Sequence, residues 1–324
     1  TFAVPCTTVP GLRGARFRLS STGVVGSGGP AMDGEIEDYL VTTKGVDFGD
    51  APDSYGTTFA ANGPNHGVNP ALPFFLGSCV DTEADAGTPL DATGDDVTAG
   101  ATTGSCAGGA DDENGVVFAG TPSACKPFSL TVNANAAGRL DAWIDWNRDG
   151  DFLDAGEQIA TNQALPLGST VINLNVPCDA VEGATFARFR LSSVGGLAPT
   201  GPAMDGEVED YTIVSRGSDF GDAPNSYGTT FASGGPLHGV STTTPLFLGA
   251  CIQTENDASL PLDATGDDIS AGDQTVGTCA VANDDEDGVV IPMLIACQSA
   301  TIAVTANAAG LLDAWIDWNR DGDF

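Results

Sequence analysis

The sequence predicts an all-β protein built from tandem repeats, each combining an antiparallel β-sandwich with a loop-rich acidic segment. The composition supports this fold, because 43 Gly and 19 Pro against 3 Met in 324 residues favour turns and strands over a helical bundle. Several short stretches alternate apolar and polar residues with the period of a strand. Long motifs also return at a fixed offset, and such repetition determines the architecture of the whole chain.

The repeat unit is 172 residues long. DFGDAP begins at Asp47 and again at Asp219, 172 positions later, and ARFRLSS at Ala15 returns at Ala187 with the same offset. LDAWIDWNRDGDF also recurs, and its second copy ends at Phe324. Since the sequence starts and stops inside a unit, we expect a segment of a longer array or a protomer completed by its neighbours.

Two kinds of sequence alternate along the chain, and the change from one to the other sets the expected domain boundaries. Residues 115–218 are expected to form a complete sandwich, residues 1–46 the last part of one sandwich, and residues 288–324 the first part of the next. Acidic loop-rich segments at 47–114 and 219–287 separate them. The expected strands of the complete sandwich are SLTVNAN from Ser129, RLDAWIDW from Arg139, STVINLNVP from Ser169, ATFARFRLS from Ala184 and GEVEDYTIV from Gly206.

The acidic segments contain little continuous strand. The first copy carries GDAPDSYGTTF, LDATGDD and DDENG, which are sequences typical of turns. Such a stretch buries too little apolar surface to be stable by itself, so we expect disulfides or metal ions to stabilise it.

The charge of the chain excludes several classes of partner. There are 44 Asp and Glu against 11 Lys and Arg, which gives a formal net charge of −33. Nucleic acid and anionic membrane surfaces are therefore unsuitable, because both require clustered basic side chains. No apolar run is long enough to span a bilayer, and the longest, from Val289 to Ala296, is interrupted by Pro292.

Each unit has four cysteines, and their context predicts disulfides. No CxxC pair is present and there are only two His, so a zinc site is not expected. Disulfides in turn indicate an oxidising, extracellular setting. Four cysteines allow three connectivities, and the alternative of buried free thiols also remains. We predict Cys79–Cys106 and Cys251–Cys279 within the acidic segments, Cys125–Cys178 across the sandwich, and bonds from Cys6 and Cys297 to neighbouring units.

The strongest chemical signal is the run Asp145-Trp-Asn147-Arg-Asp149-Gly-Asp151. Oxygen-bearing side chains at every second position, with a Gly for the sharp turn, match the start of a calcium loop. The flanks resemble strands rather than the helices of an EF-hand, and either Glu157 or Asp154 is expected to complete the ligand shell. An acidic hairpin tip without metal is the alternative. The second copy of the loop offers Asp317, Asn319, Asp321 and Asp323.

A second set of carboxylates lies in the acidic segments, where several calcium ions per repeat would relieve their mutual repulsion. A solvated acidic surface is the alternative. The candidate ligands are Asp47, Asp50, Glu83, Asp85, Asp95, Asp96, Asp111, Asp112 and Glu113 in the first copy, and Asp219, Asp222, Glu255, Asp257, Asp267, Asp268, Asp284, Asp285 and Glu286 in the second.

A third acidic motif, DGEVEDY from Asp205, has two equally good explanations. Glu207 and Glu209 share one face of a strand, where they could bind metal. Arg188 and Arg190 alternate similarly around Phe189, so cross-strand Arg–Glu pairs explain the motif equally well.

These motifs resemble a known family. DGEIEDY at Asp33 and DGEVEDY at Asp205, together with RFRLS and DWNRDGDF, are similar to the GEVED domain of bacterial and archaeal surface proteins. GDAPDSYGT at Gly49 and DDENG at Asp111 resemble the acidic segment that accompanies this domain in large secreted repeat proteins. The resemblance implies an extracellular β-sandwich repeat with calcium ligands in the DWNRDGDF loop.

Three functions compete at this point. The first is a structural calcium-binding repeat of an extracellular filament, fibre or stalk, with neighbouring copies of the same repeat as partners. The second is an adhesin-type module for glycan or protein, in which Tyr55 and Tyr227 could stack on sugars, although packing inside the turn fits them better. The third is a hydrolase, but we expect no enzyme and no catalytic residue, because no Ser-His-Asp or Cys-His arrangement appears and His66 and His238 lie in identical turns.

Overall fold

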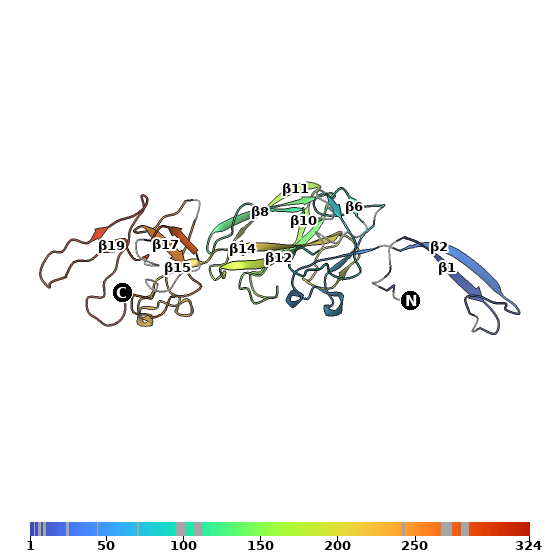
Figure 1. The fold of residues 1–324 in the computed structure, drawn as a ribbon, viewed down its shortest axis with the longest axis horizontal. Helices are drawn as coiled ribbons and strands as arrows, with labels where there is room; N and C mark the ends of the chain where they lie inside the picture. Colours follow the sequence, from blue (N-terminus) through green and yellow to red (C-terminus); the bar gives the residue numbers. More distant parts are fainter. Residues whose placement is uncertain are drawn as a thin grey trace.

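A computed structural model describes residues 1–2, 4–5, 8, 11–23, 26–43, 45–69, 71–94, 102–106, 112–241, 244–266, 274–279 and 285–324. The molecule is elongated, with an N-terminal hairpin at one end, a sandwich in the middle and the last residues at the other end (Figure 1). The helices of the described chain are short 3-10 turns, and none of them is long and apolar enough to cross a bilayer.

The central sandwich confirms the predicted fold class. Its two sheets are antiparallel, and the alternation predicted for the first strand is present, since every second residue from Phe128 to Ala134 is buried. One sheet has the order β10 (Gln158–Leu165), β9 (Gly138–Ile144), β12 (Gly183–Ser192) and β14 (Glu207–Ser215); the other has the order β11 (Gly168–Asn175), β8 (Pro127–Ala134) and β7 (Val116–Phe118).

The core of the sandwich lies between these sheets. Leu130 of β8, Leu140 and Ile144 of β9, and Phe189 and Leu191 of β12 are all fully buried in one cluster. Burial of each such side chain contributes about 1.5–3 kcal/mol, so this core stabilises the unit.

The first acidic segment packs on the outer face of the four-stranded sheet. Tyr55 lies in a small cluster with Trp143, Phe152 and Phe186 of the sandwich. The regular elements of this segment are all short: β3 (Val46–Phe48), the turns η1 (Asp53–Tyr55) and η2 (Phe59–Ala61), β4 (Asn65–Gly67), β5 (Cys79–Val80) and β6 (Thr103–Gly104). Strand β13 (Pro202–Ala203) of the sandwich runs parallel to β4 and joins the segment to it.

The N-terminal hairpin repeats the pairing of β12 with β14. Strands β1 (Gly11–Leu19) and β2 (Glu35–Thr43) place Arg16 opposite Asp38, as β12 and β14 place Arg188 opposite Asp210. The hairpin has no second sheet against it in the described chain, so Phe17 is 60% exposed, whereas the equivalent Phe189 is fully buried.

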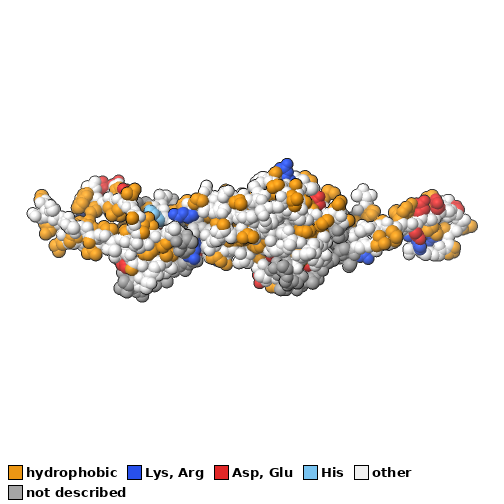
Figure 2. All heavy atoms as spheres, turned by 90° about the horizontal axis from the view of Figure 1, so that it is seen from above, with side chains coloured by type: hydrophobic (Ala, Val, Ile, Leu, Met, Phe, Trp, Pro, Cys, Tyr) orange, Lys and Arg blue, Asp and Glu red, His pale blue; other side chains and the backbone are white. Residues whose placement is uncertain are grey.

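The second acidic segment and the residues after it follow the same order of elements. They are β15 (Ser218–Phe220), η3 (Asn225–Tyr227), η4 (Phe231–Ser233), β16 (Leu237–Gly239), β17 (Cys251–Thr254), β18 (Gln274–Gly277), β19 (Val289–Val290) and β20 (Ala303–Val304). Hydrophobic side chains are exposed over the C-terminal part, at the left of Figure 2.

The structure contains the three disulfides expected within the chain, Cys79–Cys106, Cys125–Cys178 and Cys251–Cys279. Each of the first and third holds two short strands of an acidic segment together, which agrees with the need for cross-links there. Cys297 is an exposed thiol, and Cys6 lies outside the described residues.

Candidate metal sites

The loop between β9 and β10 is built around Asp145, which is fully buried. Its Oδ1 accepts the backbone N–H of Arg148 at 2.5 Å, and its Oδ2 accepts that of Gly150 at 3.2 Å. The hydroxyl of Tyr55 in the acidic segment donates to the same Oδ2 at 2.6 Å. Asp145 therefore fixes the start of the loop and also contacts the segment packed beside it.

The oxygen-bearing side chains at the next three alternate positions each form the same local turn with the backbone. Asn147 Oδ1 accepts the N–H of Asp149 at 3.1 Å, Asp149 Oδ1 that of Asp151 at 3.2 Å, and Asp151 Oδ1 that of Leu153 at 2.8 Å. Gly150 has φ 93°, a conformation that favours glycine and lets the chain reverse within the run. Because these hydrogen bonds are local, the spacing of the residues in the sequence was enough to predict that their side-chain oxygens converge.

Two overlapping groups of carboxylates result. Asp145, Asp149 and Glu157 form one, and Asp149, Asp151 and Asp154 the other, each with ligand atoms within 4.8 Å of one another. Both residues offered as alternatives to complete the shell, Glu157 and Asp154, are thus included. Asn147 is adjacent but donates its amide to Asp154 at 2.7 Å.

Glu157 is the buried carboxylate of the first group with an unpartnered oxygen. It is 2% exposed, and its Oε1 has no hydrogen-bond partner, while its Oε2 accepts the N–H of Asp154 at 3.1 Å. Burial first, and then the charges of Asp145, Asp154 and Asp149, raise the pKa of Glu157 to about 7. A hard cation would satisfy the unpartnered oxygen, so the site could hold a metal ion.

The second copy of the loop folds in the same way. Asp317 Oδ1 accepts the N–H of Arg320 at 2.5 Å, its Oδ2 that of Gly322 at 3.1 Å, and Tyr227 donates to Oδ2 at 2.9 Å. Asn319 donates to Asp321 at 2.6 Å. No convergent group of acids forms around this copy in the described residues.

The acids of the first acidic segment mostly accept backbone N–H groups. Asp85 Oδ1 binds Phe59 N at 2.6 Å, Asp50 binds Gly94 N, and Glu113 Oε1 binds Asp210 N at 2.9 Å. Asp47, Asp50 and Asp112 are no more than 3% exposed, so a merely solvated surface is wrong for them.

The second segment repeats these bonds. Asp222 binds Gly266 N, Asp257 Oδ1 binds Phe231 N at 2.8 Å, and Asp285 Oδ2 binds Gln253 N at 2.7 Å. Burial and neighbouring acids raise the pKa of Asp219 to about 7 and that of Glu255 to about 8. Six candidate ligands, Asp95, Asp96, Asp111, Asp267, Asp268 and Asp284, lie outside the described residues.

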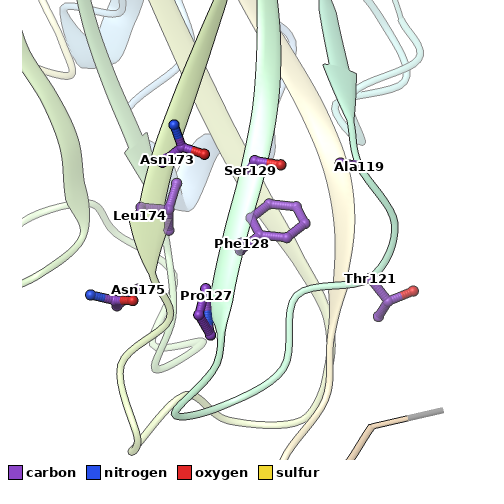
Figure 3. A pocket seen from close by; sticks show the side chains of 8 residues that line it. All are labelled: Ala119, Thr121, Pro127, Phe128, Ser129, Asn173, Leu174 and Asn175. Atoms are coloured by element: carbon purple, nitrogen blue, oxygen red, sulfur yellow. The ribbon is translucent and has the colours of Figure 1, made fainter. Parts of the chain in front are cut away.

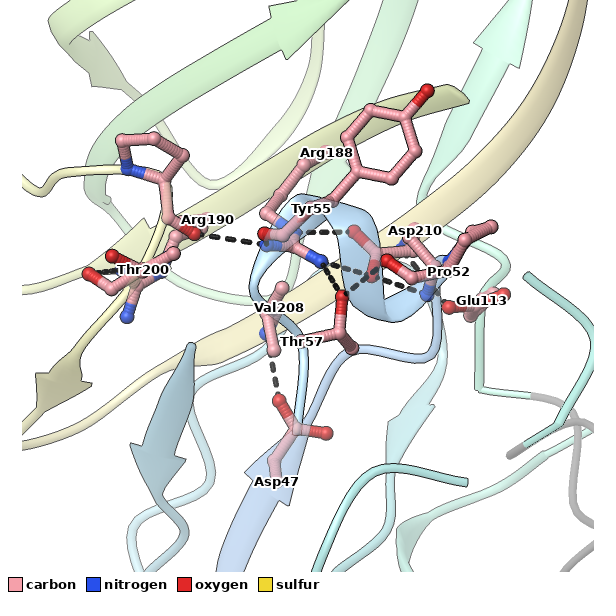
Figure 4. Close-up of polar contacts among 12 residues, drawn as sticks. Asp47, Pro52, Tyr55, Thr57, Glu113, Arg188, Arg190, Thr200, Val208 and Asp210 are labelled. Carbon is pink, nitrogen blue, oxygen red and sulfur yellow. Dashed lines mark hydrogen bonds and ion pairs between the residues drawn. The ribbon is translucent and has the colours of Figure 1, made fainter. Parts of the chain in front are cut away.

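The pairing of Arg with Glu expected in the third acidic motif is wrong, because the acid that pairs with Arg is an Asp. The register of β12 with β14 places Arg188 opposite Asp210, and the two side chains bond twice, at 2.7 and 2.8 Å (Figure 4). Both are fully buried. Arg188 also donates to Thr57 Oγ1 at 2.8 Å and to the carbonyl of Tyr55 at 3.2 Å, so the pair holds the acidic segment against the sandwich.

Arg190 lies opposite Val208 and has no acid across the strand. It donates to Nε2 of His66 at 3.0 Å and to the carbonyls of Ala198 and Thr200 at 2.6 and 3.0 Å. Nδ1 of His66 faces the carbonyl of Asp205 at 2.8 Å. Burial and then the charge of Arg190 lower the pKa of His66 well below its ordinary value, so this ring is neutral and structural. The sequence showed both residues but not their contact, since they lie 124 positions apart.

Tyr55 is 7% exposed and packs in its turn, as the sequence favoured, so it offers no open face for a sugar. A shallow hollow on the three-stranded sheet is lined by Phe128, Leu174 and small polar residues (Figure 3). None of its lining residues is ionisable, so this hollow provides neither an acid nor a base.

Comparison with known proteins matches one family model to part of the chain. Residues 139–214, which include β9, the acidic loop, β12 and β14, match the model of the GEVED domain. Searches of curated proteins and of solved structures returned no match.

Proposed function

We propose that this chain, which contains a GEVED domain at residues 139–214, is a structural calcium-binding repeat of an extracellular filament, fibre or surface stalk. The observation that supports this most directly is the convergence of Asp145, Asp149 and Glu157 on one point, with a buried unpartnered oxygen on Glu157. All the donors are oxygens, as Ca²⁺ requires, and they come from a loop able to supply six or more of them.

The proposed ion links two parts of the unit. It would bind Asp145, which also accepts the hydroxyl of Tyr55 from the acidic segment. An ion bound only by the folded state stabilises it by about 2.7 kcal/mol at 100 times its Kd. Calcium therefore makes the sandwich and the acidic segment one rigid body, which is what a load-bearing repeat requires.

The disulfides support an extracellular location. Three are present in the described chain, and such bonds persist in oxidising compartments. The exposed Cys297 is equivalent to Cys125, whose partner is Cys178. We propose that Cys297 bonds the matching cysteine of a neighbouring unit, so that copies of this repeat are its partners.

An adhesin-type module is the second candidate, because exposed apolar side chains such as Trp315 and Trp318 could contact a glycan or protein. Assembly distinguishes the two functions. Purified chain in millimolar calcium is expected to form linear assemblies in electron micrographs and a broad high-mass peak in light scattering. A chain that stays monomeric in calcium and is retained by a glycan array would instead establish the adhesin. We expect no catalytic activity in either case.

A further inference from the structure

A second group of buried acids lies apart from the loop, where the acidic segment meets strand β14. We call it the seam cluster. Its members are 0–3% exposed although each is a carboxylic acid, and they come from both sides of the contact: Asp47, Asp81 and Asp112 from the acidic segment, and Glu207 and Glu209 from β14.

Backbone N–H groups across the seam occupy one oxygen of several members. Asp47 Oδ2 accepts Val208 N at 2.7 Å, and Glu209 Oε1 accepts Gly115 N at 2.8 Å. Glu207 Oε2 accepts Leu76 N, but its other oxygen, Oε1, is buried without any hydrogen-bond partner. An unsatisfied buried oxygen of this kind costs about 1–3 kcal/mol, and more when it is charged.

Among the residues that the structure describes, no basic side chain forms an ion pair with Asp47, Glu207 or Glu209. The ion pairs of the described chain are Arg16–Asp38 in the hairpin and Arg188–Asp210 on the opposite face of β14. Arg190 donates its hydrogen bonds to His66 and to backbone carbonyls. Burial, and then the charges of the other members, raise the pKa values of Asp47 and Glu207 well above the ordinary range.

Protons alone do not satisfy this arrangement. Glu207 Oε1 has no hydrogen-bond partner, and a proton on it would neutralise one charge but leave the other buried acids around it. A cation binds the lone pairs of several oxygens directly. The seam oxygens are less tightly grouped than those of the loop, so binding has to draw them together.

We infer that the seam cluster is a second divalent-cation site, in which Asp47 and Asp112 of the acidic segment and Glu207 of the GEVED motif bind one ion. This inference rests on the proposed function, because it takes calcium to be the cation. The ion would join the segment to β14, and it explains why a strand carries two inward-facing glutamates beside an apolar core. In the second copy Asp219 and Asp285 are equivalent to Asp47 and Asp112, and Gln253 stands in the place of Asp81.

The chain offers a matched control for the test. Glu35 is equivalent to Glu207 but lies in the exposed hairpin, with no acidic segment beside it. We would measure calcium per chain by equilibrium dialysis with elemental analysis, and terbium luminescence, on the full chain. Glu207→Gln is expected to bind one ion fewer than wild type, and Glu35→Gln the same number. Asp149→Asn is expected to lose the loop ion and keep the seam ion.

Melting in EDTA provides the second readout. Glu207→Gln should then melt no lower than wild type, because Gln keeps an oxygen for the N–H of Leu76 and adds no charge to the buried acids. Unchanged calcium binding in Glu207→Gln, with loss of an ion in Asp149→Asn, would overturn the seam site and leave the loop site intact. No bound calcium in wild type would overturn both. Should Glu207→Gln fail to fold, Asp112→Asn is subject to the same criteria.

Discussion

Asp149 belongs to both carboxylate groups of the loop, so its substitution tests the calcium site most severely. Asp149→Asn keeps the size of the side chain and removes one charged ligand from each group. We expect the variant to lose the part of the calcium-induced increase in Tm that the loop ion gives the wild-type chain. Scanning calorimetry in calcium and in EDTA measures both values.

The size of the effect follows from mass action. At calcium 100 times its Kd, one ion contributes about 2.7 kcal/mol. The sandwich and its docked segment unfold together, because Tyr55 and Arg188 bridge them, and for a unit of this size 1 kcal/mol shifts Tm by roughly 2–4 °C. Loss of the ion should therefore lower Tm in calcium by about 5–10 °C.

Asp321→Asn is the matched control, since Asp321 has the same place in the second loop, where the described residues form no convergent group. It should melt like wild type in calcium. In EDTA all three proteins should melt within a few degrees of one another. If wild-type chain has the same Tm in calcium and in EDTA, the reasoning from the carboxylate groups is refuted.

Three further predictions follow from buried charge and exposed sulfur. Arg188→Leu leaves Asp210 buried without its partner and should destabilise by about 3–5 kcal/mol in urea unfolding. Arg16→Leu, in the equivalent exposed pair, should change stability far less, because solvent screens that pair. Similar losses in both variants would show that burial of the pair does not matter. Without calcium, the pKa of Glu157 is about 7 in the folded chain and about 4.5 in the unfolded chain. Between these two pH values the folded state binds one proton more than the unfolded state, so stability should fall as pH rises from about 4.5 to 7. Melting temperatures at pH 5 and 7.5 in EDTA check this, and a higher Tm at pH 7.5 would contradict it. Finally, Cys297→Ser should abolish covalent species larger than one chain on non-reducing gels, and gels of wild type that show monomer alone would argue against bonds between units.

Much of the fold was predictable because its determinants are local. The alternation in β8 identifies the buried face of a strand without knowledge of its neighbours, and Phe128, Leu130 and Val132 do lie in the core. The acidic loop was equally predictable, since Asn147, Asp149 and Asp151 each accept a backbone N–H group two residues later. Such contacts are fixed by spacing in the sequence.

The contacts between the acidic segment and the sandwich were not predictable, because they depend on register and docking. A shift of one residue would place a different acid opposite Arg188, and the sequence alone does not exclude it. Asp47 and Val208 meet although they lie 161 positions apart. The pairing of RFR with EDY in both copies was the available signal, and it indicated that charges meet there without saying which acid is the partner.

The most direct test of the account is the density at the acidic loop in crystals or filaments prepared with calcium. We predict one strong peak bound by Asp145, Asp149 and Glu157 at about 2.3–2.6 Å, with Glu157 Oε1 among its ligands. A loop with no such peak, in which Asn147 still donates to Asp154 as in the present structure, would contradict it.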